Sequence, residues 1–207
     1  MKLGMVQKKI KFGLMKGPLF YAKILLFGEY GIIKDSKGLS IPYNFFQGGL
    51  KIPDKRSKIF HDSHTKLLDF AKFLRTIDSN LVKFDWVKMD EDLSRKLCFD
   101  SSIPQGYGLG SSGALVASFY DRYAIEKITI LENLTREKLK KLKNIFAEME
   151  AFFHGKSSGL DPLNSYLSLP ILINSRENIQ STGIPSQNLE GKGAVFLLDS
   201  GSARKTG

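Results

Sequence analysis

The sequence has few of the features that mark a secreted or membrane-spanning chain. Its 207 residues include a single cysteine, Cys98, which excludes an internal disulfide and fits a reducing compartment. No apolar run reaches the roughly 18 to 20 residues that a bilayer crossing needs. The basic N-terminus is followed by no long apolar region and no small-residue cleavage site of a signal peptide. We therefore expect a cytoplasmic protein with no membrane partner.

Acidic residues are missing from the first 14 positions, which hold four lysines. We expect residues 1–14 to be a disordered basic extension and Met15 to be the natural start. The net charge of +10 invites a nucleic-acid role, because Lys and Arg neutralise phosphates. After the extension the excess of bases is mild, and its densest cluster, 136–143, has the helical spacing of a solvated face. We expect no nucleic-acid partner, and a basic surface suits an anionic small substrate equally well.

The hydrophobic fraction of 42% is large enough to build a sizeable core. Strand and helix patterns are mixed, without the strict alternation of a parallel sheet, so the predicted class is α+β. An apolar segment at 166–173 is interrupted by Pro170. Strands are predicted in 20–33 (around a tight turn), 40–50, 81–89, 97–103 and 193–199, and helices in 62–74, 111–125 and 135–153.

The most specific motif is P-Q-G-Y-G-L-G-S-S-G at residues 104–113, between a predicted strand and a predicted helix. Glycines adopt positive φ angles and let the backbone approach phosphate oxygens. The helix that follows has unpaired N–H groups and a partial positive charge at its start, so loop and helix together form an anion site. Ser111 and Ser112 add hydroxyls that bind phosphate or magnesium.

The motif has three other interpretations. A Walker A loop is excluded, because no Lys follows the last glycine. Gly108, Gly110 and Gly113 satisfy the G-x-G-x-x-G spacing of a dinucleotide-binding fold, although no clear acid closes a second strand about 20 residues on. The third is a glycine-rich turn with an N-capping serine. Four glycines and two serines between a strand and a helix favour the phosphate site over such a turn.

Candidate acids follow in and after the longest predicted helix. Glu150 lies at the edge of its apolar stripe, where a carboxylate can lean into a cleft and bind a metal together with Ser112. An ordinary boundary Glu is the alternative, and Glu148 on the opposite edge is only slightly less well placed. Asp161 ends the polar loop H-G-K-S-S-G-L-D, where it can cap a turn or take a proton from a substrate hydroxyl. His154 is interpreted as a hydrogen-bonding loop residue, and Cys98 as a small core residue.

Together these segments resemble the GHMP kinases. The resemblance rests on A-K-I-L-L-F-G-E-Y-G-I-I at 22–33, the glycine loop at 104–114, and G-S-A-R-K-T at 201–206. Residues 150–161, E-A-F-F-H-G-K-S-S-G-L-D, are similar to the mevalonate kinase version of the family motif. This implies a GHMP kinase N-terminal domain with a ribosomal-protein-like β-α-β fold.

The resemblance also implies how the chain is divided. The ATP-binding N-terminal domain would span 15–190, and 191–207 would begin a truncated following region. The family's third, glycine-rich motif lies in a C-terminal domain that is largely absent here, which leaves open whether this fragment is active.

The resemblance further implies roles for individual residues. Asp161 would be the catalytic base and Lys23 would stabilise charge beside it, while Ser112 and Glu150 would hold Mg²⁺. The triphosphate of ATP would be bound by Gly106, Gly108, Leu109, Gly110, Ser111, Ser112 and Gly113. The substrate would be contacted by Glu29, Tyr30, His154 and Thr206. The implied reaction is ATP- and magnesium-dependent phosphorylation of the primary hydroxyl of mevalonate, and a homodimer is left open.

Two residues depart from the usual mevalonate kinase sequence and favour a different substrate. Mevalonate kinases usually have His at the position of Tyr30, and Ala is common at the position of Gly113, so both residues favour phosphomevalonate kinase. The loop 154–161 favours mevalonate kinase and has the greater weight because it carries the base. Phosphomevalonate kinase or another GHMP kinase is therefore the alternative. A dinucleotide-binding oxidoreductase and a catalytically dead GHMP-like binding module are more distant ones.

Overall fold

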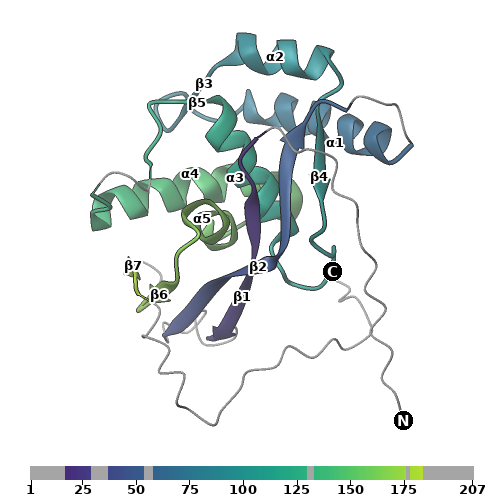
Figure 1. The fold of residues 1–207 in the computed structure, drawn as a ribbon. Helices are drawn as coiled ribbons and strands as arrows, with labels where there is room; N and C mark the ends of the chain where they lie inside the picture. The colour runs from purple at the N-terminus through teal and green to yellow at the C-terminus, as the bar shows by residue number, and fades with distance from the viewer. Residues whose placement is uncertain (1–16, 29–36, 54–57, 130–132, 176–177, 184–207) are drawn as a thin grey trace, which may run out of the picture.

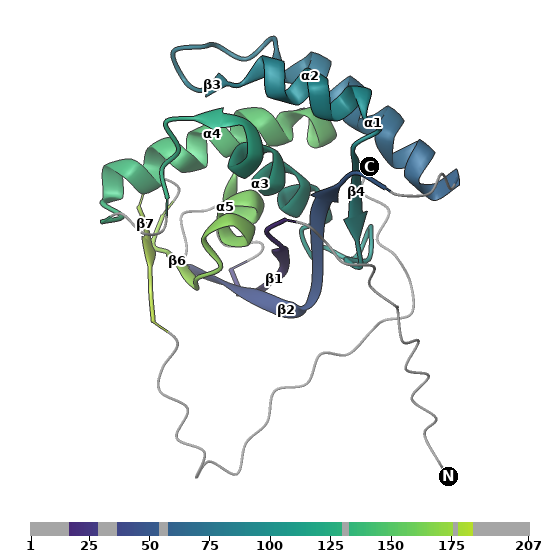
Figure 2. The same ribbon diagram turned by 45° about the horizontal axis from the view of Figure 1, so that its top comes forward.

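The computed structural model has helices packed on one face of a small antiparallel sheet (Figures 1 and 2). The structure describes residues 17–28, 37–53, 58–129, 133–175 and 178–183. In chain order the elements are β1 (Phe20–Phe27), β2 (Gly38–Lys51), α1 (Lys58–Leu74), β3 (Lys83–Phe84), α2 (Trp86–Ser94), β4 (Cys98–Ser101), α3 (Ser111–Tyr123), β5 (Ala124–Ile125), α4 (Arg136–His154), α5 (Leu160–Leu167), β6 (Ile171–Ile173) and β7 (Ile179–Ser181).

Strand β2 is the centre of the five-stranded sheet. It pairs with β1 along one edge and with β4 and β6 along the other, and β7 pairs with β6. Every strand pairing in the described part of the chain is antiparallel, including that of β3 with β5 in a second, two-stranded sheet. A dinucleotide-binding fold requires parallel βαβ units, so this arrangement contradicts the oxidoreductase alternative.

The predicted α+β class is confirmed, as are the three predicted helices, which are α1, α3 and α4. The expected β-α-β order at the glycine loop is present as β4, α3 and β5. Its two strands lie in different sheets, because β5 pairs with β3. The predicted strand at 193–199 and the extension at 1–14 lie outside the described residues.

The prediction of a strand over 81–89 is wrong. Alternating apolar residues suggested extended structure, but β3 has only two residues and α2 begins at Trp86. The reason is a helix cap: the side chain of Asp85 accepts a hydrogen bond from the Lys88 N–H at 3.0 Å. Of the alternating apolar residues, Phe84 therefore lies in the short strand β3 and Val82 directly precedes it, and the strand ends where this cap starts a helix.

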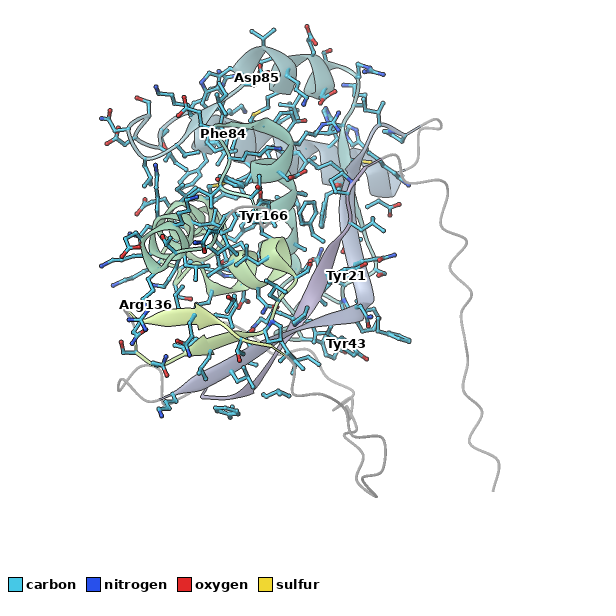
Figure 3. All side chains as sticks on the ribbon, turned by 60° about the vertical axis from the view of Figure 1, so that its left-hand side comes forward. Tyr21, Tyr43, Phe84, Asp85, Arg136 and Tyr166 are labelled. Atoms are coloured by element: carbon cyan, nitrogen blue, oxygen red, sulfur yellow. The ribbon has the colours of Figure 1, made fainter. Side chains whose placement is uncertain are left out.

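Aromatic side chains fill the layer between the helices and the sheet (Figure 3). Tyr166 on α5 is at the junction, with ring centroids 6.4 Å from Phe20 on β1, 5.2 Å from Tyr120 on α3 and 5.6 Å from Phe146 on α4. A smaller apolar cluster around Ala22 and Ala114 joins β1 directly to α3. This packing fixes the start of α3 and the start of α5 against β1, which is where the candidate site lies.

Candidate functional site

The loop between β4 and α3 has the backbone that its glycines predict. Gly106, Gly108 and Gly110 have φ angles of 81°, 69° and 78°, in the left-handed region that favours glycine. A Cβ added to Gly108 would meet no atom within 4 Å, so the space beside this exposed backbone is open. The Lys23 N–H donates a hydrogen bond to the Leu109 carbonyl at 3.0 Å. The loop is therefore anchored to β1 while its glycine backbone faces outward.

Helix α3 begins without a side-chain cap. Gly110 is its N-cap residue, no side chain makes a capping hydrogen bond there, and Ser111 is already the first helical residue. The N-capping serine of the plain-turn alternative is therefore not found. Because the first N–H groups of a helix have no partner within it, an uncapped start behind a glycine loop can accept an anion.

Lys23 and Asp161 form an ion pair beside this loop. The Lys23 Nζ on β1 lies 2.9 Å from Asp161 Oδ1, and the two side chains are 11% and 36% exposed. A Cβ added to Gly110 would lie 3.0 Å from Lys23 Cγ and 3.7 Å from Asp161 Oδ2, so the loop backbone rests against the pair. Asp161 was predicted at the end of a loop, but it lies in the first turn of α5, a helix that the sequence analysis missed.

Ser112 connects α3 to α4. Its Oγ donates a hydrogen bond to Glu150 Oε1 at 3.0 Å and lies 3.2 Å from His154 Nε2. His154 was interpreted as a loop residue, but it is the last residue of α4, because the helix continues to the positive-φ cap at Gly155. The side chain of His154 is turned toward Ser112, so the C-terminal end of α4 contributes to the candidate site.

Glu150 is more deeply placed than the edge position predicted from the helical stripe, since the residue is only 3% exposed. Helices α3 and α5 both pack against α4, and the sequence pattern of α4 alone contains no sign of this packing. Burial, followed by the charge of Asp161, raises the pKa of Glu150 from 4.5 to about 7. Hydrogen bonds from Ser157 and Ser112 and the charge of Lys23 act in the opposite direction.

The Ser112 and Glu150 oxygens fit adjacent positions of a magnesium ion. Ligands at 2.0–2.1 Å in neighbouring octahedral positions are about 2.9 Å apart, and these two oxygens are 3.0 Å apart. Magnesium commonly binds through one or two protein ligands, with phosphates and waters completing its shell. The described residues contain no cluster of three or more His, Cys, Asp or Glu that could form a closed metal site. The donor set therefore suits a magnesium ion that arrives with a nucleotide.

Close packing explains why position 113 is a glycine, which the sequence did not reveal. A Cβ at this position of α3 would lie 2.7 Å from the Asp161 carbonyl carbon and 2.8 Å from the Pro162 nitrogen. Glycine lets the backbone of α3 approach the first turn of α5 and so holds Asp161 close to the loop. The close packing therefore gives a structural reason for glycine at this position.

Three expected substrate-contacting residues, Glu29, Tyr30 and Thr206, lie outside the described residues. Conversely, sequence reasoning missed Ser157, whose Oγ donates to Glu150 Oε2 at 2.5 Å. No spacing rule points to this contact, because it depends on how the chain turns between α4 and α5.

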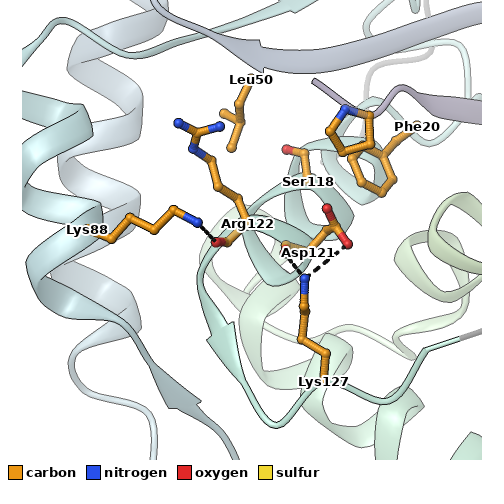
Figure 4. A pocket seen from close by; sticks show the side chains of 8 residues that line it. Phe20, Leu50, Lys88, Ser118, Asp121, Arg122 and Lys127 are labelled. Atoms are coloured by element: carbon orange, nitrogen blue, oxygen red, sulfur yellow. Dashed lines mark hydrogen bonds and ion pairs between the residues drawn. The ribbon is translucent and has the colours of Figure 1, made fainter. Parts of the chain in front are cut away.

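A cavity of ≈ 260 Å³ lies away from these residues, beside the C-terminal half of α3 (Figure 4). None of the predicted site residues lines it. Its cationic side chains have local partners: Arg122 pairs with Asp92 at 2.7 Å, Lys127 with Asp121 at 3.5 Å, and Lys88 Nζ donates to the Arg122 carbonyl at 3.1 Å. These contacts join α2, α3 and the segment after β5, so we assign the cavity a structural role.

None of the described helices has the length and apolar composition required to span a bilayer. Residues 73–168, from the end of α1 to just beyond α5, match the model of the GHMP kinases N terminal domain. This match agrees with the GHMP kinase N-terminal domain expected from the sequence. It includes the glycine loop, Glu150 and Asp161. No curated protein sequence matches the chain.

Solved structures of mevalonate kinases resemble the chain at low identity. The enzyme from methicillin-resistant Staphylococcus aureus MRSA252 is 17% identical, with 79% of this chain and 53% of that chain covered and a TM-score of 0.42. The Methanococcus jannaschii mevalonate kinase is 16% identical, with 80% and 55% covered and a TM-score of 0.43. A third mevalonate kinase is 18% identical, with 81% and 55% covered and a TM-score of 0.42. The chain therefore spans about half the length of these proteins.

Proposed function

We propose that this chain is the ATP-binding part of a magnesium-dependent small-molecule kinase. The observation that carries the proposal is the contact of three groups: the glycine loop, the Lys23–Asp161 ion pair and the Ser112–Glu150 pair. A phosphate-binding backbone, a carboxylate with a neighbouring ammonium, and a magnesium-compatible pair of oxygens are the parts that phosphoryl transfer to a hydroxyl requires. All three meet where α3 and α5 begin.

Each part has a distinct role in this proposal. Residues Gly106 to Ser112 hold the triphosphate through backbone N–H groups and the start of α3. Asp161 accepts the proton of the substrate hydroxyl as its oxygen bonds to the γ-phosphorus and ADP leaves, and Lys23 balances negative charge there. Ser112 and Glu150 would hold the magnesium ion, which neutralises charge on the phosphates when bound. The chemistry thus consists mainly of positioning and charge neutralisation.

We assign mevalonate as the acceptor, because the 150–161 segment resembles the mevalonate kinase motif and carries the base. Phosphomevalonate is the alternative acceptor, favoured by Tyr30 and Gly113. We propose that the substrate is contacted by His154, Glu29, Tyr30 and Thr206. A cytoplasmic location and the division of the chain at residues 15–190 and 191–207 belong to the same proposal.

The test is a substrate panel. The protein is incubated with ATP, Mg²⁺ and mevalonate, phosphomevalonate, homoserine or galactose, and ADP release is measured while NAD binding is followed in parallel. We expect magnesium-dependent ATP binding and ADP release with mevalonate. Binding of NAD without ATP would contradict the kinase assignment, and release of ADP with another acceptor would correct the substrate.

Asp161→Ala tests the role of the base in the same assay. We expect turnover to fall by several orders of magnitude while ATP still binds, because the phosphate loop is intact. Asp69→Ala is the matched control, since this exposed aspartate on α1 pairs with Lys72 far along the chain from the site. Near-normal turnover in Asp161→Ala would refute the role.

A further inference from the structure

The five residues between α4 and α5 determine how Glu150 and Asp161 are placed relative to each other. Gly159 is the N-cap of α5 with a φ of 71°. A Cβ on Gly159 would lie 2.1 Å from the Lys143 carbonyl oxygen and 2.7 Å from the Ala147 nitrogen, both on α4. The start of α5 therefore rests directly on the backbone of α4, and the connection is fixed at this glycine.

Ser157 lies in this connection and makes two hydrogen bonds. Its Oγ accepts from the Gly159 N–H at 3.0 Å and donates to Glu150 Oε2 at 2.5 Å. The hydroxyl therefore joins the buried carboxylate of α4 to the fixed cap of α5. Because both of its neighbours are held by close packing, the hydroxyl has a defined position.

The two oxygens of Glu150 have different partners as a result. Oε2 accepts the bond from Ser157, whereas Oε1 is directed toward Ser112 on α3. A carboxylate held in this way offers one oxygen to a metal at the Ser112 side. Magnesium suits such monodentate carboxylates, whereas calcium often takes both oxygens of a carboxylate at longer distances.

We propose that Ser157 is a positioning residue that fixes Glu150 Oε2, so that Oε1 binds the nucleotide-borne magnesium ion together with Ser112. This assignment rests on the proposed kinase function and adds to it. Partners that orient metal ligands typically contribute 10–100-fold to metal affinity. Loss of the Ser157 hydroxyl is therefore expected to weaken metal binding about tenfold and to reduce the preference for Mg²⁺ over Ca²⁺.

The experiment measures metal binding without turnover. Mn²⁺ is titrated into the protein with the non-hydrolysable nucleotide AMP-PNP, and free Mn²⁺ is followed by electron paramagnetic resonance. We expect about tenfold weaker Mn²⁺ binding in Ser157→Ala and recovery in Ser157→Thr, which keeps the hydroxyl. Ser94→Ala is the matched control, because this serine at the end of α2 donates to the Glu91 carbonyl and lies outside the site. It should bind Mn²⁺ as the wild type does.

A double variant separates positioning from a general loss of structure. If Ser157 acts through Glu150, adding Ser157→Ala to Glu150→Gln should weaken Mn²⁺ binding no further, and a further loss would overturn the assignment. Equal Mn²⁺ affinity in wild type and Ser157→Ala would overturn it as well, with the proposed function left standing. A wild-type protein that binds no Mn²⁺ with the nucleotide would instead overturn the proposed function and this assignment together.

Discussion

The hydroxyl oxygen of Ser112 lies 3.0 Å from Glu150 Oε1, although 38 residues separate the two in sequence. This contact joins the uncapped start of α3 to a carboxylate that is almost completely buried in α4. Burial of the carboxylate is compatible with folding because two serine hydroxyls donate to it. Without a bound metal ion, however, the ionised form of Glu150 is disfavoured by burial.

Replacing Glu150 by Gln should change the pH dependence of stability in the metal-free protein. Because the pKa of Glu150 is raised from 4.5 to about 7, its contribution to stability is fully present below pH 4.5 and is lost as the pH rises through 7. The variant lacks this loss. Its free energy of unfolding relative to wild type should therefore increase by roughly 2 kcal/mol between pH 5 and pH 8.5.

Urea unfolding at the two pH values measures this effect. Glu148→Gln is the control, because Glu148 is exposed on the same helix. Parallel pH profiles for wild type and Glu150→Gln would show that Glu150 titrates normally in the folded protein.

Replacing Gly113 by Ala should destabilise the protein, against the usual trend. Ala in place of Gly within a helix normally stabilises by about 0.5–1 kcal/mol. Here the new methyl would lie 2.7 Å from the Asp161 carbonyl carbon, so α5 must move or the helix must distort. We expect a loss of about 1–3 kcal/mol in urea unfolding. In Gly183→Ala, where a Cβ would meet no atom within 4 Å, the change should be small. A more stable Gly113→Ala would mean that α5 adjusts freely.

Asp92 should contribute strongly to the attachment of α2 to α3. The residue is 5% exposed, and Arg122 and Tyr123 donate hydrogen bonds to it at 2.7 and 3.0 Å. Burial alone would raise the pKa of Asp92, but these hydrogen bonds and the charges of Arg122 and Arg95 lower it overall. Its contribution is therefore present above the ordinary pKa of 3.8 and is lost as the pH falls below it.

Asp92→Asn should lower the free energy of unfolding at pH 7 by about 3–5 kcal/mol, because it leaves Arg122 without its charged partner. The matched control on the same helix is Asp90→Asn. Asp90 also pairs with an arginine, Arg75, but both side chains are exposed, so the expected cost is about 0–1 kcal/mol. Equal effects of the two substitutions in chemical unfolding would contradict the difference in burial.

Cys98 should be unreactive in the folded protein. It is completely buried, and burial raises the pKa of its thiol from 9.0 to about 11. Thiolate is the reacting form, so Ellman's reagent at pH 8 should label the protein only after unfolding. Rapid labelling of native protein would show that β4 opens to solvent.

The parts of the fold that the sequence predicts are those with strong local signals. Helix α4 has a long apolar stripe and Thr135 as its cap, and the glycine loop has a composition that few other structures require. Helix α2 was missed because the signal for its start is one capping residue, Asp85, whereas the alternating apolar residues around it predicted a strand. Helix α5 was missed because it is short, follows a glycine N-cap and contains Pro162 in its first turn.

The same difference between local signals and tertiary packing applies to the candidate site. Its residue types could be named from motifs, but their environments could not. The burial of Glu150 results from other segments packing against the edge of α4, and the bond from Ser157 depends on the turn between α4 and α5. Both are tertiary effects, and a helical wheel drawn for α4 contains neither of them.

The hydrogen bond and the ion pair between β1 and α5 also determine when the candidate site can form during folding. Ser165 Oγ donates to the Tyr21 carbonyl across 144 residues, and Lys23 pairs with Asp161 across a similar span. Contacts of such separation have a high loop-closure cost and form late in folding. During synthesis, the contacts of β1 with α5 therefore form only after α5 has left the ribosome. A nascent chain that stops between α4 and α5 can pair β1 with β2 and pack it on α3, but it leaves Lys23 and the Tyr21 carbonyl without their partners on α5.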